Sequence, residues 1–153
     1  MTLFDRRRWL PFLLNLYPPY LGAGVRVRAS ADLRTFEVRM GLRFWNRNYV
    51  GTHFGGSLYA MCDPFFMLIL IEHLGRDYVV WDKAATIRFR RPGKGRVRAT
   101  FHIPEERVAE IRAAADRDGK VEPVFRVDVV NDRGEVVAEV EKLLYVRRKP
   151  SPE

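Results

Sequence analysis

The feature that most constrains the fold is the apolar stretch of residues 58–71, which directly follows two glycines, Gly55 and Gly56. Nearly every residue in it is apolar, so a helix formed here has no polar face and must be surrounded by the rest of the fold. The stretch is shorter than the roughly 20 residues that cross a bilayer. We therefore predict a buried core helix and no membrane span.

One carboxylate, Asp63, interrupts the apolar stretch. It follows Gly56 by two helical turns and so lies on the same side as the helix start, where backbone N–H groups are unpaired. Burying an unpaired carboxylate is costly, so Asp63 needs a partner or a raised pKa. Pro64 cannot donate a backbone hydrogen bond, which predicts a kink at Asp63. The kink would push the carboxylate outward or let it cap a restarted helix.

Alternation of apolar and polar residues marks strands on both sides of the helix. Residues 24–44 predict two strands joined near residues 31–34, and four more are predicted after the helix, the last two as a hairpin. In the first of these four, Trp81, Lys83, Ala85, Ile87 and Phe89 would share one face. Glu105–Asp118 has the spacing of a surface helix inserted between strands.

The first 20 residues predict a short amphipathic helix packed on the domain, because their apolar residues recur at helical spacing. Pro11 is tolerated only in the first helical turn, so we expect the helix to begin near Arg8. Residues 148–153 are expected to be a flexible tail. The whole chain, residues 1–153, then forms a single α+β domain, an antiparallel sheet wrapped round one long helix.

Composition narrows the functional classes. The 153 residues, 47% of them hydrophobic, fit one domain with a real core. The net charge of +8 favours a polyanionic partner, namely nucleic acid, an acidic membrane surface or a phosphorylated ligand, although arginines alternating with apolar residues are also typical of a solvated sheet face. The single cysteine, Cys62, lies in the apolar stretch, which indicates packing and a reducing, cytoplasmic setting. No ligand spacing for a metal and no nucleotide-binding motif is found, so we expect no metal and no resident cofactor.

A resemblance is carried by Asn48, the triplet Phe54-Gly55-Gly56 and Asp63. Their spacing resembles the signature of hotdog-fold thioesterases of the phenylacetate-pathway type: Asn, His-Gly-Gly six residues later, and Asp seven residues after the second Gly. Phe54 stands where that signature has His, and His53 lies one position early. Gly-Thr before this triplet and Asp-Pro in the helix are similar to hotdog-like domains of the DUF4442 type. A Pro-Gly turn at residues 92–93 is a second point of similarity.

The resemblance implies a hotdog fold and hydrolysis of an acyl-CoA thioester. Asp63 would attack the thioester or activate water, while the backbone N–H groups of Gly55 and Gly56 would stabilise the oxyanion. Asn48 would bind the carbonyl or hold the water. The Asp of one subunit would meet the Gly-Gly turn of its partner, which requires a homodimer or homotetramer.

Other residues are candidates for substrate binding, each with a structural alternative. Phe54 and His53 border the glycine turn. Lys83 would either neutralise Asp63 or extend to water at a strand end. The basic turn formed by Arg90, Arg91 and Lys94 suits the phosphates of coenzyme A, or is a solvated edge.

The same site residues also have purely structural readings. Gly55 and Gly56 would then be a tight helix entry, Asn48 a turn residue bonded to its own loop, and Asp63 a carboxylate satisfied by nearby backbone. Two functions therefore compete with thioester hydrolysis. One is a non-catalytic acyl or lipid binder, favoured by Phe54 and the Asp63 kink. The other is a nucleic-acid binder, favoured by charge alone and lacking an exposed aromatic platform.

Overall fold

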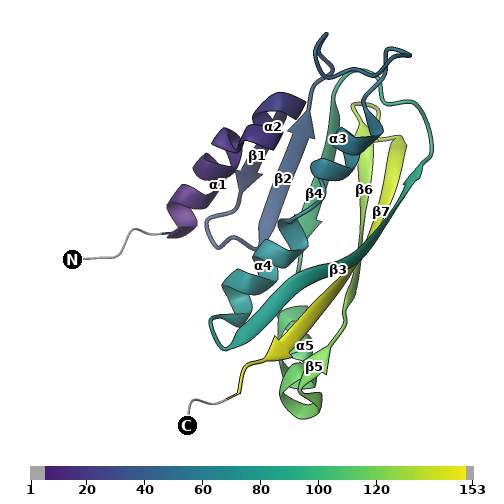
Figure 1. The fold of residues 1–153 in the computed structure, drawn as a ribbon. Coiled ribbons are helices and arrows are strands. Elements are labelled where there is room, and N and C mark those ends of the chain that lie inside the picture. The colour runs from purple at the N-terminus through teal and green to yellow at the C-terminus, as the bar shows by residue number, and fades with distance from the viewer. Residues whose placement is uncertain (1–5, 151–153) are drawn as a thin grey trace.

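A computed structural model describes residues 6–150 as one antiparallel sheet curled around a central helical segment (Figure 1). The strand order is β1-β2-β4-β6-β7-β3, and the short β5 pairs with β7. The bounds of the strands are β1 (Val25–Ala29), β2 (Thr35–Met40), β3 (Tyr78–Phe89), β4 (Val97–His102), β5 (Lys120–Val121), β6 (Val124–Asn131) and β7 (Val136–Arg148). The predicted α+β architecture, a sheet wrapped round a buried helix, is confirmed.

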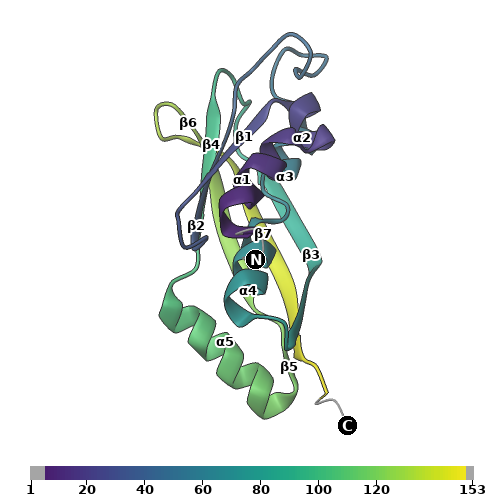
Figure 2. The same ribbon diagram turned by 90° about the vertical axis from the view of Figure 1, so that its left-hand side faces the viewer.

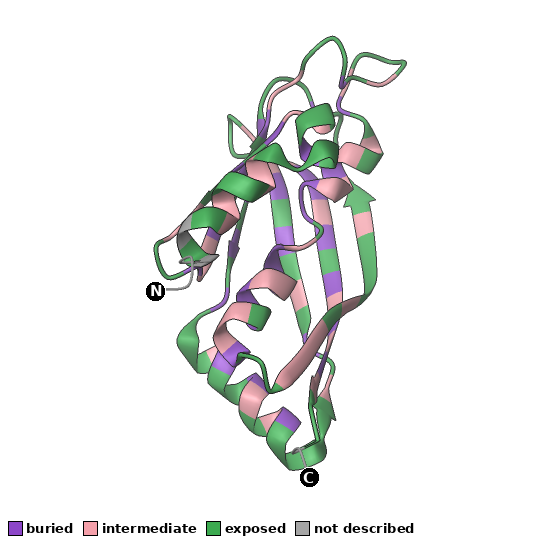
Figure 3. Ribbon diagram, turned by 60° about the vertical axis from the view of Figure 1, so that its left-hand side comes forward, coloured by how far each residue is buried: buried purple, intermediate pink, exposed green. Residues whose placement is uncertain are grey.

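The core lies between the inner sheet face and helix α4 (Phe65–Leu74). Alternate strand residues are buried there, as the sequence alternation predicts, and the intervening residues form the exposed outer face (Figure 3). Phe65 packs its ring 5.3 Å from that of Phe36 and 4.8 Å from that of Phe101, measured between centroids. Aromatic contacts therefore fix α4 on β2 and β4.

The central helical segment is broken rather than kinked. Helix α3 (Gly55–Ala60) ends in a tight turn, in which Asp63 donates its backbone N–H to the carbonyl of Ala60, and α4 restarts after Pro64. The break follows from Pro64, which lacks the N–H that would continue the helix. Within the described residues, Gly55–Leu74 is the one helical stretch with the length and hydropathy of a membrane span, and in the fold it is the core segment.

The N-terminal segment contains two helices instead of the one predicted. Helix α1 (Arg6–Leu16) already includes Pro11 in its middle, and α2 (Pro18–Ala23) begins at the two prolines Pro18 and Pro19. Proline is favoured in the first helical turn, where its missing N–H has no partner to lose. Residues 1–5 of the predicted N-terminal segment lie outside the described residues.

Asn15 of α1 bonds to the backbone of the edge strand β1. Its Nδ2 donates to the Val27 carbonyl at 2.8 Å, and its Oδ1 accepts from the Val27 N–H at 2.9 Å. These are the two hydrogen bonds that another strand would make to Val27. Helix α1 thus covers this edge of the sheet, as Figure 2 shows from the side.

A β-bulge changes which residues of β3 face the core. The register on β7 shifts between Asp82 and Ala84, so Lys83 is the extra residue. The predicted shared face is therefore correct from Ala85 onward but wrong for Trp81, which stacks on Tyr145 at the outer face. The bulge turns Asp82 toward the interior instead.

The last part of the chain closes one end of the sheet. Helix α5 (Glu105–Asp118) has the bounds predicted from its sequence, and Arg112 donates hydrogen bonds to the carbonyls of His73 and Leu74 at the end of α4. The C-terminal tail begins later than predicted, because β7 runs to Arg148 and Lys149 donates its backbone N–H to Asp77 at 2.8 Å. Residues 151–153 lie outside the described residues.

Candidate functional site

The Gly55–Gly56 turn opens helix α3, and no side chain caps it. The backbone N–H groups of Gly55 and Gly56 have no acceptor among the described residues, because the first turn of a helix leaves such donors free. A Cβ at Gly56 would lie 2.6 Å from the ring of Phe54, and one at Gly55 would lie 3.0 Å from the ring of Phe89. A side chain at either position would therefore displace an aromatic ring from the turn.

Two surface hollows flank this turn and bring seven of the ten predicted site residues together. A hollow of about 520 Å³ between α2 and α3 is lined by Asn48, Phe54 and Gly56. A second, of about 470 Å³ beside the end of β3, is lined by Asn48, His53, Gly55, Arg90 and Arg91. Asp63, Lys83 and Lys94 line neither hollow.

Asn48 and His53 hold the loop that leads into the turn. The Asn48 side chain accepts a hydrogen bond from the Thr52 N–H at 2.9 Å and donates to the Thr52 hydroxyl at 3.0 Å. The buried His53 ring donates through Nε2 to the Gly95 carbonyl at 2.7 Å, and its backbone N–H bonds to Gly93. Burial lowers the pKa of His53, so the ring is neutral at pH 7. Both side chains thus make structural bonds within the site.

The basic turn after β3 is largely paired with acidic residues. Arg90 binds Glu139 at 2.6 Å, and Arg91 binds Glu135 at 2.9 Å. Lys94 is exposed and makes no ion pair among the described residues. Of the three predicted phosphate ligands, two therefore already have carboxylate partners.

Asp63 lies at the break between α3 and α4, with its side chain 53% exposed. The Tyr59 hydroxyl donates to its Oδ1 at 2.9 Å. Lys142 of β7 donates from Nζ to the Asp63 carbonyl at 2.7 Å and to Oδ1 at 3.2 Å. The carboxylate is thus held by two donors while one side of it stays open to solvent.

Lys142 is fully buried and contacts four acceptor groups on three residues. Besides Asp63, its Nζ contacts the Tyr59 hydroxyl at 3.1 Å and Asp82 Oδ2 at 3.1 Å. Burial alone would lower the pKa of Lys142, but the hydrogen bond to Tyr59 and the charges of Asp82 and Asp63 outweigh it, so the net shift is upward. Lys142 is therefore a charged lysine inside the core, under the candidate carboxylate.

Asp82 is the second carboxylate of this cluster, and it is less well satisfied. Its Oδ1 is buried without a hydrogen-bond partner. Burial raises its pKa, against the opposing effect of Lys142. One lysine therefore serves two carboxylates, and the better solvated Asp63 is the one able to reach a ligand.

Of the two readings of Lys83, the structure agrees with the solvent-facing one, and the lysine beside Asp63 is Lys142. Lys83, the bulged residue of β3, forms an exposed ion pair with Glu122. The sequence signal for Lys142 is its position in the alternation of β7, since it lies on the same strand face as the buried residues Ala138, Val140, Leu144 and Val146. A charged residue on the buried face of a strand indicates a buried partner.

Cys62, next to Asp63, has no nucleophilic role here. It is buried, and burial raises the pKa of its thiol to about 12. A thiol in this state is protonated and unreactive at neutral pH. The expectation that Cys62 serves packing is consistent with this geometry.

The chain is similar to known proteins in both sequence and fold. The model of a family described as a domain of unknown function (DUF4442) matches residues 6–146. No curated protein matches the chain. Among solved structures, PA5026 from Pseudomonas aeruginosa, described as a probable thioesterase of unknown function, is 25% identical with a TM-score of 0.78, over 97% of this chain and 98% of that one.

Two further structures share the fold at lower identity. Thioesterase HI1161 from Haemophilus influenzae is 14% identical with a TM-score of 0.66, and the match covers 98% of this chain and 95% of that one. The PaaI protein of the phenylacetic acid degradation operon of E. coli is 17% identical with a TM-score of 0.60, over 97% and 98% of the two chains. The fold is therefore that of the hotdog thioesterases.

Proposed function

Because the chain belongs to the DUF4442 family and has the fold of the hotdog thioesterases, we propose that it hydrolyses an acyl-CoA thioester. The observation that carries the proposal is the pairing of half-exposed Asp63 with buried Lys142. The buried ammonium group of Lys142 gives Asp63 a hydrogen-bond donor and a counter-charge, while one side of the carboxylate stays open to solvent. A carboxylate that acts as a base or nucleophile must be ionised.

The reaction assigns a role to each group. The free N–H groups of Gly55 and Gly56 donate to the thioester oxygen as it becomes negative. Asp63 takes a proton from water, whose oxygen attacks the carbonyl carbon, and the C–S bond then breaks. The proton passes from Asp63 to the leaving thiolate, and the products are a carboxylic acid and a thiol. Lys142 and Tyr59 hold the carboxylate in position throughout.

We further propose that the site is shared between subunits of a homodimer, or of a homotetramer built from such dimers. The β1 edge of the sheet is covered by Asn15, while β3 at the other edge has no strand partner on its outer side in the described chain. An unpaired edge of twelve residues favours pairing with a second copy. Asp63 of one subunit would then face the Gly-Gly turn of the other.

One observation supports a non-catalytic acyl binder as the second candidate. Phe54 replaces the histidine of the thioesterase signature, and its ring lies against Gly56, where it makes the turn more apolar. Such a turn binds an acyl chain as readily as it positions a carbonyl. Turnover separates the two candidates.

The test is the substitution Asp63→Asn, which keeps the shape of the side chain and removes its charge. We expect hydrolysis of acyl-CoA thioesters to fall on the order of a hundredfold or more. The control is Asp128→Asn on the exposed outer face of β6, which should leave the rate unchanged. Wild-type protein that binds acyl-CoA without hydrolysing it would establish the acyl binder instead.

A further inference from the structure

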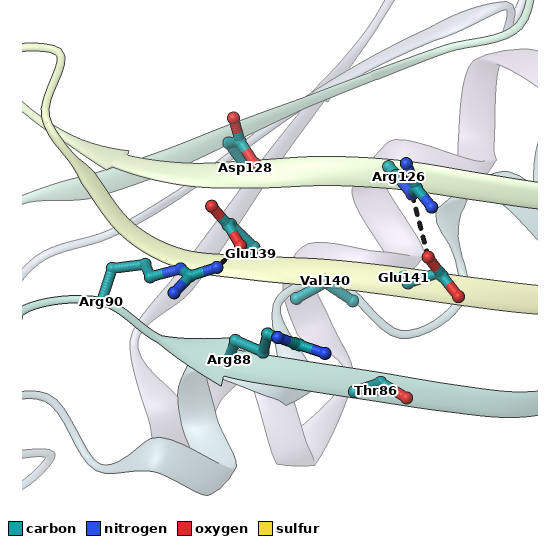
Figure 4. A pocket seen from close by; sticks show the side chains of 8 residues that line it. All are labelled: Thr86, Arg88, Arg90, Arg126, Asp128, Glu139, Val140 and Glu141. Atoms are coloured by element: carbon teal, nitrogen blue, oxygen red, sulfur yellow. Dashed lines mark hydrogen bonds and ion pairs between the residues drawn. The ribbon is translucent and has the colours of Figure 1, made fainter.

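The outer face of the sheet carries two different charge arrangements. On β6, β7 and β3, arginines and carboxylates are mixed: Arg126 binds Glu141 at 2.9 Å, and Glu139, which lies between Arg88 and Asp128, binds Arg90 (Figure 4). Opposite charges in directly facing positions stabilise a sheet. This half of the outer face therefore neutralises itself.

On β1, β2 and β4, Arg28 lies opposite Glu37, but a row of three arginines has only like charges as neighbours across the strands. Arg26 lies directly opposite Arg39, and Arg39 lies directly opposite Arg98. These three side chains form no ion pair with any carboxylate of the described residues. Like charges facing one another across a sheet are destabilising. The row therefore concentrates unpaired positive charge on this part of the outer face, which favours the binding of an anion.

The row borders a groove of about 440 Å³ at the end of the sheet next to α2. Arg26, Arg39, Arg43 and Arg96 line it together with Leu21 and Trp45, and no carboxylate contributes to its lining. Glu37 and Asp132 line the adjoining groove, which Arg39 and Arg96 also border. Four arginines that form no ion pair with a carboxylate of the described residues suit a ligand with several phosphates, because arginine binds phosphate through paired hydrogen bonds.

The position of Trp45 connects this groove to the candidate site. Its side chain, 56% exposed, lines both the arginine groove and the hollow at Gly56. A ligand with its thioester at Gly56 could therefore run past Trp45 into the arginine groove, with the indole available to stack on a base. Arg90 and Arg91, which also border the site, are already paired with glutamates.

We infer that the groove formed by Arg26, Arg39, Arg43, Arg96 and Trp45 binds the multiply phosphorylated nucleotide end of the thioester's carrier. The identification of this ligand as part of a thioester rests on the proposed function. The anion-binding groove itself rests on the unpaired arginines.

Binding is tested by calorimetry with adenosine 3′,5′-bisphosphate, which requires no turnover. The double substitution Arg26→Gln and Arg39→Gln should weaken binding about tenfold or more, as expected for the loss of two charge-assisted contacts. The matched control is Arg88→Gln with Arg126→Gln on the other half of the same face. It removes the same charge and should change affinity less than about twofold. Equal losses in both variants would show diffuse attraction to a +8 chain and overturn the inference.

Two further arms make the result decisive. The melting temperature of the Arg26/Arg39 variant should be no lower than that of wild type, because two charges of a repulsive row are removed. If the variant does not fold, the binding test is repeated with the double substitution Arg43→Gln and Arg96→Gln, whose positions both lie in loops. A decathymidine strand distinguishes nucleic acid: groove-dependent binding of the strand, with no binding of the bisphosphate, would overturn the inference.

The outcomes also separate this inference from the proposed function. Groove-dependent bisphosphate binding in a protein that hydrolyses no thioester would refute the hydrolase and leave the groove standing. Thioester hydrolysis together with bisphosphate binding that the double substitution leaves unchanged would support the hydrolase and refute the groove.

Discussion

At the scale of single residues, the electrostatics of the candidate site depend on Lys142. Asp63 was predictable from sequence because a carboxylate inside an apolar helix is conspicuous. Lys142, 79 positions further along the chain, was not, because only the register of β7 places it under the helix break. A short-range pattern identifies a residue that needs a partner, whereas the identity of the partner depends on tertiary structure.

Lys142→Met should strongly destabilise the fold, because it leaves Asp63 and Asp82 without their counter-charge. Breaking a buried pair typically costs about 3–5 kcal/mol of unfolding free energy. The control is Lys83→Met, which removes the exposed pair with Glu122 and should cost at most about 1 kcal/mol. Urea denaturation measures both, and similar losses for the two lysines would contradict the assigned roles.

At the scale of elements, most strands were predictable and the irregularities were not. Alternation located β1, β2, β4, β6 and β7, since each has one buried face. It failed at Lys83, because a bulge is a property of two paired strands. It also failed at α2, because two prolines are equally consistent with the end of one helix and the start of the next.

His53, in the loop that leads to the glycine turn, should make the free energy of unfolding depend on pH. Burial lowers its pKa in the folded state, so the fold favours the neutral ring and loses stability as the pH falls below the unfolded value of about 6.5. His73 has a lowered pKa as well and contributes in the same direction. His53→Gln keeps a donor for Gly95 but cannot take up a proton.

The melting temperature of wild type should therefore drop more between pH 7.5 and pH 5.5 than that of His53→Gln. Thermal unfolding monitored by circular dichroism at the two pH values measures this difference. Parallel decreases in the two proteins would show that His53 titrates normally. The His102→Gln variant, whose exposed ring bonds only to Thr35, serves as the control.

At the scale of the whole molecule, subunit complementation tests the shared site. Asp63→Asn and Gly56→Ala should each lower activity strongly, the second because the new Cβ would push the Phe54 ring away from the turn that donates to the thioester oxygen. If each site combines Asp63 of one subunit with the turn of the other, a mixed dimer contains one intact site. Equal co-expression should then restore about a quarter of wild-type activity, since about half of randomly formed dimers are mixed.

Light scattering provides the matching physical measurement. A dimer or tetramer should give two or four times the chain mass of 17.9 kDa. A mass of 17.9 kDa across micromolar concentrations, or mixtures as inactive as their components, would contradict a site shared between subunits.

The two hydrogen bonds from Asn15 to Val27 have a consequence for how the sheet can grow. A sheet with two open edges can add chains at both ends and extend without limit, as fibrils do. Here a side chain already occupies the hydrogen-bonding groups of Val27 at one edge, so each chain can be joined at the other edge only. Pairing of sheet edges then stops at two copies of the chain, because α1 blocks the β1 edge of each copy.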